Sequence, residues 1–422
     1  MTFFLVSSIA KVVVVFTAIL VTVALTTLVE RRICAFIQDR LGPNRVGLQG
    51  LLQPAADGLK SLLKEETLPV RADKALFLLA PAISFTPALL TFAVIPFAAP
   101  LPTRWGDVPM VVADLPVGFL YILAISSLGV YGVTLAGWSS NNKYALLGGL
   151  RASAQMISYE IAMGMSTVAV LLLAGNVTLS RVIAQQQAGG WYVLSLLLAF
   201  FIFLVSAFAE TNRVPFDLPE AEGELIAGYH TEYSAMKFSM FYIAEYANML
   251  TASALMATLF FGGWDIPFTS WDNGPPWTLA KTLATGAVFC VKTACFMFLY
   301  IWVRWTLPRF RYDQLMALGW KVLLPLALVY LTVLATAVWY LKEQLGWAYG
   351  PAFGWALFGL NAVLAGLLFW WLDRDRHQAS PSPSPAPRAT EPETMRPRSS
   401  HQNSNLASTA LSPNSIQPKA GP

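Results

Sequence analysis

Nine apolar stretches of about 20 residues constrain the fold of this chain more than any other feature of its sequence. A stretch of that length crosses a lipid bilayer as an α-helix. Hydrophobic residues make up 56% of the chain and charged residues only 12%, whereas soluble domains carry roughly 25% charged residues. We therefore predict an all-α polytopic membrane protein. The predicted spans are residues 5–29, 75–99, 115–138, 155–175, 191–210, 239–262, 281–303, 321–341 and 351–372.

The positions of lysine and arginine predict how these spans are oriented. Fifteen of these residues lie in four alternate connections, and only three lie in the others. Because short cytoplasmic loops are enriched in Lys and Arg, we expect the N-terminus to be periplasmic and the C-terminal end to be cytoplasmic. The four basic connections are residues 30–73, 139–154, 211–238 and 304–321.

Composition divides the chain into three segments. Residues 1–345 hold eight predicted spans, and residues 346–375 hold one additional C-terminal span. Residues 376–422 form a tail in which, from about Ala379 onward, Ser and Pro dominate and large apolar residues nearly vanish. Such a composition cannot bury a core, so we expect the tail to be disordered.

The sequence contains no pattern for binding a redox carrier. Its three cysteines, Cys34, Cys290 and Cys295, form no CxxC or Cys/His pairing, and no nucleotide-binding fingerprint is present. We therefore expect no metal site and no bound cofactor. If redox chemistry takes place here, the electron carrier belongs to another chain.

One predicted cytoplasmic connection contains an amphipathic segment, Gly50 to Pro69. Its leucines and alanines recur at helical spacing, with Asp57, Lys60 and Lys64 on the other side. This pattern is typical of a helix that lies in the membrane interface. Two roles remain open, a simple surface anchor or a cover over a lateral opening from the lipid.

The connection after the fifth span is strongly acidic. Pro215 and Pro219 exclude a continuous helix there, and Phe216 is interleaved with the acids. We interpret this segment as a surface packed under another subunit, although an ordinary solvated loop has the same composition. Its carboxylates are Glu210, Asp217, Glu220, Glu222, Glu224 and Glu232.

Three carboxylates, Glu160, Glu210 and Glu245, are predicted to lie deeper, each flanked by apolar helix, and Lys292 is the matching cation. A charge inside the membrane is costly unless it is paired or hydrated, so such residues mark proton or ion pathways. The alternative is a structural ion pair, for example between Lys292 and one of the glutamates. Three acids on three helices favour a hydrated proton route.

Five stretches of the chain carry a resemblance to a known family. They read ERRICAFIQDRLGPNRVG, LLQPAADGLKSLLKE, NNKYALLGGLRASAQMISYE, AETNRVPFDLPEAEGELIAGYHTEY and LPRFRYDQLM. In order and spacing they resemble the H subunit (NuoH) of bacterial NADH–quinone oxidoreductase, the ND1 subunit of respiratory complex I. The resemblance covers about residues 5–341 and implies an eight-helix core. The ninth span and the Ser/Pro tail depart from the family pattern.

The resemblance implies a function for this membrane subunit. Its substrate is a quinone, and it forms the membrane part of the quinone chamber, while NADH, FMN and iron–sulfur clusters are bound by partner subunits. The implied partners are the quinone-module subunits of the peripheral arm, the A, J and K subunits of the membrane arm, and the antiporter-like subunits. The implied location is the bacterial inner membrane.

The resemblance also implies roles for individual residues. Glu160, Glu210 and Glu245, with Lys292, belong to the entry of the proton channel. Some relatives carry an acid in the third span, where this chain has Ser126 and Ser127. The residues of the chamber region are Arg31, Asp39, Arg40, Asp57, Phe216, Asp217, Glu220, Glu222 and Glu224.

Two alternatives remain open at this stage. The first is the homologous membrane subunit of an energy-converting hydrogenase, which shares the helical core and the buried acids. The second is a stand-alone secondary transporter, although such folds usually show internal repeats and none is found here.

Overall fold

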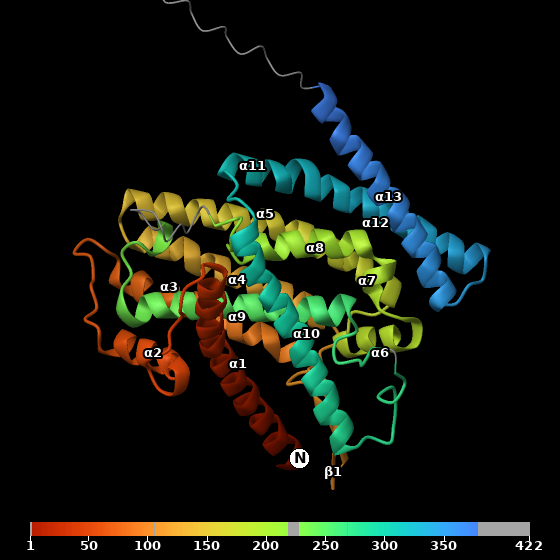
Figure 1. The fold of residues 1–422 in the computed structure, drawn as a ribbon, viewed down its shortest axis with the longest axis horizontal. Coiled ribbons are helices and arrows are strands. Elements are labelled where there is room, and N and C mark those ends of the chain that lie inside the picture. The colour runs from red at the N-terminus through yellow and green to blue at the C-terminus, as the bar shows by residue number, and fades with distance from the viewer. Residues whose placement is uncertain (1, 105, 218–227, 268, 379–422) are drawn as a thin grey trace, which may run out of the picture. The chain divides into compact units, whose positions relative to one another are not determined.

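The computed structural model describes every residue except 1, 105, 218–227, 268 and 379–422 (Figure 1). The chain separates into two compact units, Met1–Leu368 and Phe369–Pro422. Within the second unit, the described part is the end of one helix that runs to Gln378. The predicted tail therefore begins as helix, and the rest of it lies outside the described residues.

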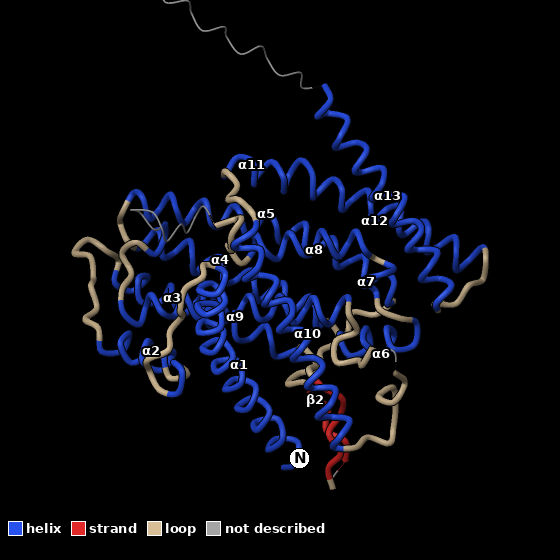
Figure 2. The backbone as a smooth tube through the Cα atoms, viewed as in Figure 1, coloured by secondary structure: helices blue, strands red, loops and turns tan. Residues whose placement is uncertain are grey.

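Helices account for nearly all of the described secondary structure (Figure 2). The α-helices are α1 (Thr2–Ile37), α2 (Gln53–Leu63), α3 (Lys74–Leu90), α4 (Gly118–Ser139), α5 (Lys143–Ala174), α6 (Leu179–Gly189), α7 (Tyr192–Ser195), α8 (Leu197–Glu210), α9 (Ala235–Phe260), α10 (Leu279–Thr306), α11 (Tyr312–Ala317), α12 (Leu324–Trp339) and α13 (Pro351–Gln378). Short 3-10 turns are η1 (Leu48–Gly50), η2 (Thr91–Val94) and η3 (Gly228–His230). Two π-helical turns, η4 (Leu318–Leu323) and η5 (Tyr340–Gln344), join α11 and α12 into one long segment and extend it.

Seven helical segments of the described chain are long and apolar enough to cross a membrane. They correspond to the predicted spans one to four and seven to nine, which confirms an all-α polytopic membrane protein. The seven segments are Leu5–Ile37, Lys74–Val94, Gly118–Ser139, Lys143–Ala174, Leu279–Thr306, Tyr312–Gln344 and Pro351–Trp371.

The fifth and sixth predicted spans are also helical, but each differs from a simple apolar span. The fifth is broken at Leu196, between α7 and the 14-residue helix α8. The sixth is α9, which is 26 residues long and packs against α1, α3, α8 and α10. Because neighbouring helices surround α9, it carries polar side chains that a lipid-facing helix would not.

Some boundaries and small elements differ from the prediction. The connection predicted at 139–154 is short, because α5 begins at Lys143, capped by the side chain of Asn142. Arg151 therefore lies on a helix, which continues through Gly148 and Gly149. Helix α6 and the antiparallel hairpin of β1 (Ala98–Thr103) and β2 (Gly106–Met110) were not predicted (Figure 2).

The connections between helices form two separate groups. The four predicted cytoplasmic connections contact one another through Asn141–Arg71 (3.2 Å), Asn142–Glu232 (2.7 Å) and Arg309–Asp217 (3.1 Å). At the opposite end of the helices, contacts join predicted periplasmic segments and the adjoining ends of predicted spans: Lys11–Val111 (2.9 Å), Ser180–Asp114 (2.9 Å) and Ala99–Thr285 (3.1 Å). Successive membrane spans run in opposite directions, so their connections are expected to form two groups at opposite ends of the helices, as they do here.

Candidate functional site

A pocket of about 850 Å³ lies between α1, α2, η3 and α9. One part of its lining is apolar and includes Leu20 and Val23 of α1 and Ile243 of α9. Another part is charged and includes Arg31 at the end of α1 and Asp57 of α2. The pocket therefore suits an amphiphilic molecule with an apolar tail and a polar head.

The amphipathic helix predicted in the first cytoplasmic connection forms one side of this pocket. Helix α2 has no buried residue, and its Asp57 carboxylate pairs with Arg31 at 2.6 Å and lies 4.0 Å from the Lys60 ammonium. The Gln53 amide also donates to Asp57, at 3.1 Å. Of the predicted chamber residues that the structure describes, Arg31 and Asp57 line the pocket.

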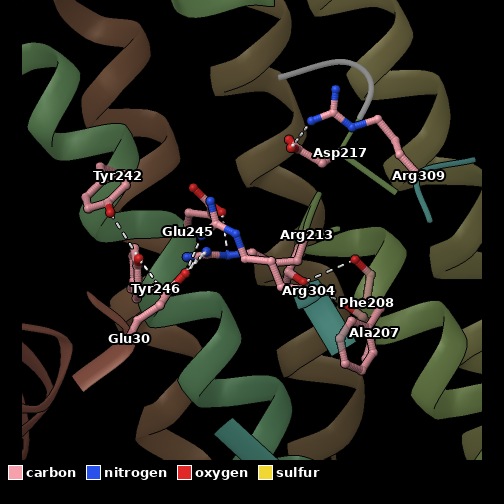
Figure 3. Close-up of polar contacts among 11 residues, drawn as sticks. Glu30, Ala207, Phe208, Arg213, Asp217, Tyr242, Glu245, Tyr246, Arg304 and Arg309 are labelled. Carbon is pink, nitrogen blue, oxygen red and sulfur yellow. Dashed lines mark hydrogen bonds and ion pairs between the residues drawn. The ribbon is translucent and has the colours of Figure 1, made fainter. Parts of the chain in front are cut away.

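A cluster of charged side chains lies at the same end of the helices, where α1, α9 and α10 meet the loop after α8 (Figure 3). The Arg213 guanidinium lies 2.7 Å from a Glu245 oxygen and 3.2 Å from a Glu30 oxygen. Arg304 of α10 pairs with the same Glu30 carboxylate. The side chains of Glu30 and Arg213 are only 5% and 11% exposed. They form the buried part of a network of two acids and two bases, in which Glu245 and Arg304 are 22% and 39% exposed.

Burial and charge act in opposite directions on Arg213, which follows the end of α8. Burial alone would lower the pKa of its guanidinium, but the Glu245 and Glu30 carboxylates hold that pKa above its usual range. Arg213 therefore remains a fixed positive charge between two carboxylates. Its guanidinium also lies 4.3 Å from the ring centroid of Tyr246.

Two tyrosines of α9 connect the pocket to this cluster (Figure 3). Tyr242 lines the pocket, and its hydroxyl lies 3.0 Å from the Tyr246 hydroxyl. Tyr246 donates a hydrogen bond of 2.6 Å to Glu30. Residues four apart on a helix lie on one face, which explains how α9 aligns the two hydroxyls. A continuous polar connection therefore runs from the pocket to Arg213 and Glu245.

Glu160 and Glu210 form a second group. Glu210 is the last residue of α8 and interacts electrostatically with Glu160 of α5. The Ser127 hydroxyl of α4 donates a hydrogen bond to Glu160, so one of the two serines in the third span contacts a predicted channel carboxylate. Tyr300 of α10 lies within electrostatic range of both Glu210 and Arg213.

Asp217 and Phe216 belong to the loop that follows Arg213. Asp217 pairs with Arg309 at 3.1 Å, and Phe216 is buried, with its ring 5.7 Å from those of Tyr159 and Phe310. Neither residue lines the pocket. The other predicted chamber residues of this loop lie outside the described residues: Glu220, Glu222 and Glu224.

Asp39 and Arg40 lie just beyond α1 and are exposed. Asp39 has a positive φ of 51°, which fits a tight turn after the helix. The Arg40 side chain donates to Gln38 at 2.6 Å. Both lie outside the pocket lining, although the sequence groups them with Arg31 and Asp57.

Lys292 lies away from the three predicted channel carboxylates. Its ammonium donates to the carbonyl oxygens of Phe261, Gly263 and Asp265 at 2.7, 3.0 and 2.6 Å. It also lies 4.4 Å from the Trp191 ring centroid. Within the described chain, the ammonium is therefore held by the loop that follows the C-terminal end of α9. Glu245 lies nearer the N-terminal end of that helix. An ion pair with Glu160, Glu210 or Glu245 is not formed.

Several residues of the site were missed by sequence reasoning. Glu30, Arg213 and Arg304 occur where spans meet loops, and charge at such positions is already explained by the orientation rule. Tyr242 and Tyr246 lie in an aromatic-rich helix and carry no motif. A useful signal existed only for Glu30, an acid directly before two arginines at the end of a long apolar helix.

Comparison with known proteins identifies the family. A family described as NADH dehydrogenase matches residues 10–335. The NADH-quinone oxidoreductase H subunit 1 of Geobacter metallireducens is 54% identical over 326 residues, which cover 77% of this chain and 94% of that protein. The corresponding H subunit 1 of Cytophaga hutchinsonii is 48% identical over 335 residues, covering 79% and 97%. NADH-quinone oxidoreductase subunit 8 of Rhodothermus marinus is 51% identical over 329 residues, covering 76% and 94%. The chain therefore belongs to the family of the NADH-quinone oxidoreductase H subunit.

Proposed function

We propose that this chain is the membrane subunit of a proton-translocating NADH–quinone oxidoreductase that forms the membrane wall of the quinone chamber and the entry of the proton path. The observation that carries this proposal is the connection of an amphiphilic pocket to a buried charged cluster by Tyr242 and Tyr246. Family membership supports the proposed reaction, and the geometry supports the roles proposed for the residues.

In this proposal the pocket receives a quinone from the membrane. The apolar lining from α1 and α9 contacts the isoprenoid tail, and the charged lining around Arg31 and Asp57 accompanies the polar head. Electrons arrive from partner subunits, which bind NADH, FMN and the iron–sulfur clusters. Reduction of the quinone to the neutral quinol takes up two electrons and two protons. In this proposal the protons are drawn from titratable groups beside the pocket, so the charge of those groups changes until they are reprotonated.

The charged cluster is suited to transmit that change. Arg213 is shared by Glu30 and Glu245, so protonation of one carboxylate strengthens the attraction of the guanidinium for the other. Coupled carboxylates of this kind titrate as a unit rather than independently. Glu210 and Glu160 would continue the path between α5 and α8, and Tyr300 lies within electrostatic range of both Arg213 and Glu210. Lys292 is proposed to hold the far end of α9 instead of carrying protons.

The two groups of connections indicate where partners bind. The basic connections gather at the end that holds the pocket and the cluster, and we propose that the quinone-module subunits dock there from the cytoplasm. The A, J and K subunits of the membrane arm and the antiporter-like subunits would receive the proton path within the bacterial inner membrane. The hydrogenase and transporter alternatives gain no support from the relatives named above.

Glu245→Gln tests the proton path. This change keeps the side-chain shape but removes its ionisation, and Arg213 keeps Glu30 as a partner, so the complex should still assemble. We expect proton translocation and quinone turnover to fall, whereas NADH oxidation by ferricyanide, a hydrophilic acceptor, should remain. Glu245→Asp should retain part of both activities.

The matched control for this test is Glu343→Gln, a change at an exposed residue of the other end, which should pump normally. Normal pumping by Glu245→Gln at normal enzyme content would overturn the proton-path role and leave Glu245 as a structural partner of Arg213.

Asp57→Asn tests the pocket separately. It weakens the pair with Arg31 at the polar part of the lining, so we expect a higher KM for a short-chain ubiquinone and unchanged ferricyanide reduction. Glu65→Gln is the control, because Glu65 is exposed close to α2 but does not line the pocket. An unchanged KM in Asp57→Asn would remove the pocket from the quinone path.

A further inference from the structure

His230 is a buried imidazole at the pocket that neither the family resemblance nor the charged cluster explains. It is 8% exposed and lines the 850 Å³ pocket with α1, α2 and α9. Within the described part of the chain, neither of its ring nitrogens makes a hydrogen bond; only its backbone carbonyl does, accepting from Tyr233 at 2.9 Å. These nitrogens are not among the fully buried unpartnered polar atoms of the described residues, so they remain accessible from the pocket, where a ligand or water can hydrogen-bond them.

The surrounding structure holds this ring in place. The Tyr229 ring lies 5.1 Å from it at 83°, and the Phe238 ring lies 5.3 Å from it. The turn η3 packs closely against α5. A Cβ atom at Gly148 of α5 would lie only 2.7 Å from the backbone of Gly228 in this turn. His230 is therefore fixed by aromatic and backbone packing, and its polar atoms are left for a ligand.

The ring is neutral at physiological pH. His230 lies outside the membrane-spanning segments, and burial lowers its pKa to about 4. A neutral imidazole has one N–H donor and one nitrogen acceptor. The same side chain can therefore donate to the carbonyl of a quinone and accept from the hydroxyl of the corresponding quinol.

We propose that His230 is a ligand-contacting residue that hydrogen-bonds the head group of a quinone in this pocket. This inference rests on the proposed function, because it requires the pocket to lie on the quinone path. Its basis is the combination of an unpartnered buried imidazole, an apolar lining for the tail and the packing that fixes the ring. The nearby Lys60 and Lys64 would also suit a phospholipid phosphate, so the test must separate the two ligands.

The experiment compares wild type, His230→Phe, His230→Asn and His230→Gln in the assembled complex in native membranes. The phenylalanine keeps the ring but removes both polar atoms, and the two amides restore a donor and an acceptor at different reach. We expect His230→Phe to raise the KM for a short-chain ubiquinone about tenfold with little change in kcat or ferricyanide reduction. At least one amide variant should restore most of the affinity.

Photolabelling with an azido-ubiquinone distinguishes failure of this inference from failure of the proposed function. Quinone-competed labelling of peptides from α1 and α9 in wild type, weakened in His230→Phe, supports the inference. Equal labelling and equal KM in wild type and His230→Phe would overturn the role of His230 alone. Absence of labelling in wild type would overturn the quinone pocket itself. A photoactivatable phospholipid that labels the pocket and is not displaced by quinone would assign it to lipid and overturn both.

Discussion

Arg213 neutralises two carboxylates within a buried site, so its removal should be costly. Arg213→Met removes the ion pair of Glu245 with Arg213 and leaves Glu30 with Arg304 and the Tyr246 hydroxyl. Removing one member of a buried ion pair costs about 3–5 kcal/mol, so we expect the complex to assemble poorly or to melt at a clearly lower temperature. Thermal unfolding of the purified complex measures this effect.

The control for this prediction is Arg309→Met, which breaks the Asp217 pair at side chains that are 37% and 20% exposed. Exposed pairs contribute about 0–1 kcal/mol, so this variant should stay close to wild type. The double variant Arg213→Met, Glu245→Gln should recover part of the loss. Equal stability of the two arginine variants would show that the Arg213 network is not a stabilising element.

His230 provides a prediction about pH. Its pKa is about 4 in the folded chain because of burial, against an ordinary value of 6.5. The unfolded chain therefore binds this proton at a higher pH than the folded chain, so stability is lost as the pH falls from about 6.5 toward 4. We expect the melting temperature of wild type to fall more steeply between about pH 7 and about pH 4.5 than that of His230→Asn. If the melting temperatures of wild type and His230→Asn fell in parallel over this pH range, the prediction would be wrong.

The sequence was a better guide to which charged residues lie among apolar helices than to the residues with which they form ion pairs. Glu160, Glu210 and Glu245 stand out because each is an acid within an apolar stretch, and the structure places two of them together. Glu245 pairs instead with Arg213, 32 positions earlier, and through it with Glu30, a further 183 positions away. Packing of distant helices decides such pairs, and no local pattern encodes them. The pairing of Lys292 with backbone carbonyls could not be foreseen for the same reason.

At the scale of elements, α13 explains the break in the fifth predicted span. No proline or glycine marks Leu196, so the sequence predicts one continuous helix over 191–210. In the structure, the buried Asn361 amide of α13 donates to the Ser195 carbonyl at 2.8 Å, and its oxygen accepts from the Leu198 N–H at 3.2 Å. A side chain more than 160 positions away therefore satisfies the backbone groups that the break leaves free.

Asn361→Leu tests this role of α13. The change leaves the Ser195 carbonyl and the Leu198 N–H unpaired in an apolar interior, which costs about 1–3 kcal/mol. We expect a lower melting temperature and faster proteolysis of the complex. Val363→Leu on the same helix is the control, because Val363 is 61% exposed. An Asn361→Leu complex as stable as this control would show that the break does not depend on α13.

At the scale of the whole molecule, the separation of the two groups of connections allows a prediction of the membrane orientation. The basic group includes Asn44, which is exposed beyond α1, and the opposite group includes Asp107, which is exposed in the β1–β2 hairpin. The distribution of lysine and arginine predicts that the first group faces the cytoplasm. This assignment is tested with single cysteines at these two positions.

The test begins from a chain in which Cys34, Cys290 and Cys295 are replaced by serine or alanine and which still assembles. A membrane-impermeant thiol reagent added to spheroplasts should label Asp107→Cys and leave Asn44→Cys unlabelled, because only the hairpin faces the outside. In inverted vesicles Asn44→Cys should react, or should become reactive once the peripheral arm is stripped, since partner subunits are expected to cover that end. The reverse labelling pattern would mean that the chain has the opposite orientation in the membrane. The pocket and the charged cluster would then face the periplasm, where no cytoplasmic NADH-oxidising arm can reach them, and the proposed function would fail with the orientation.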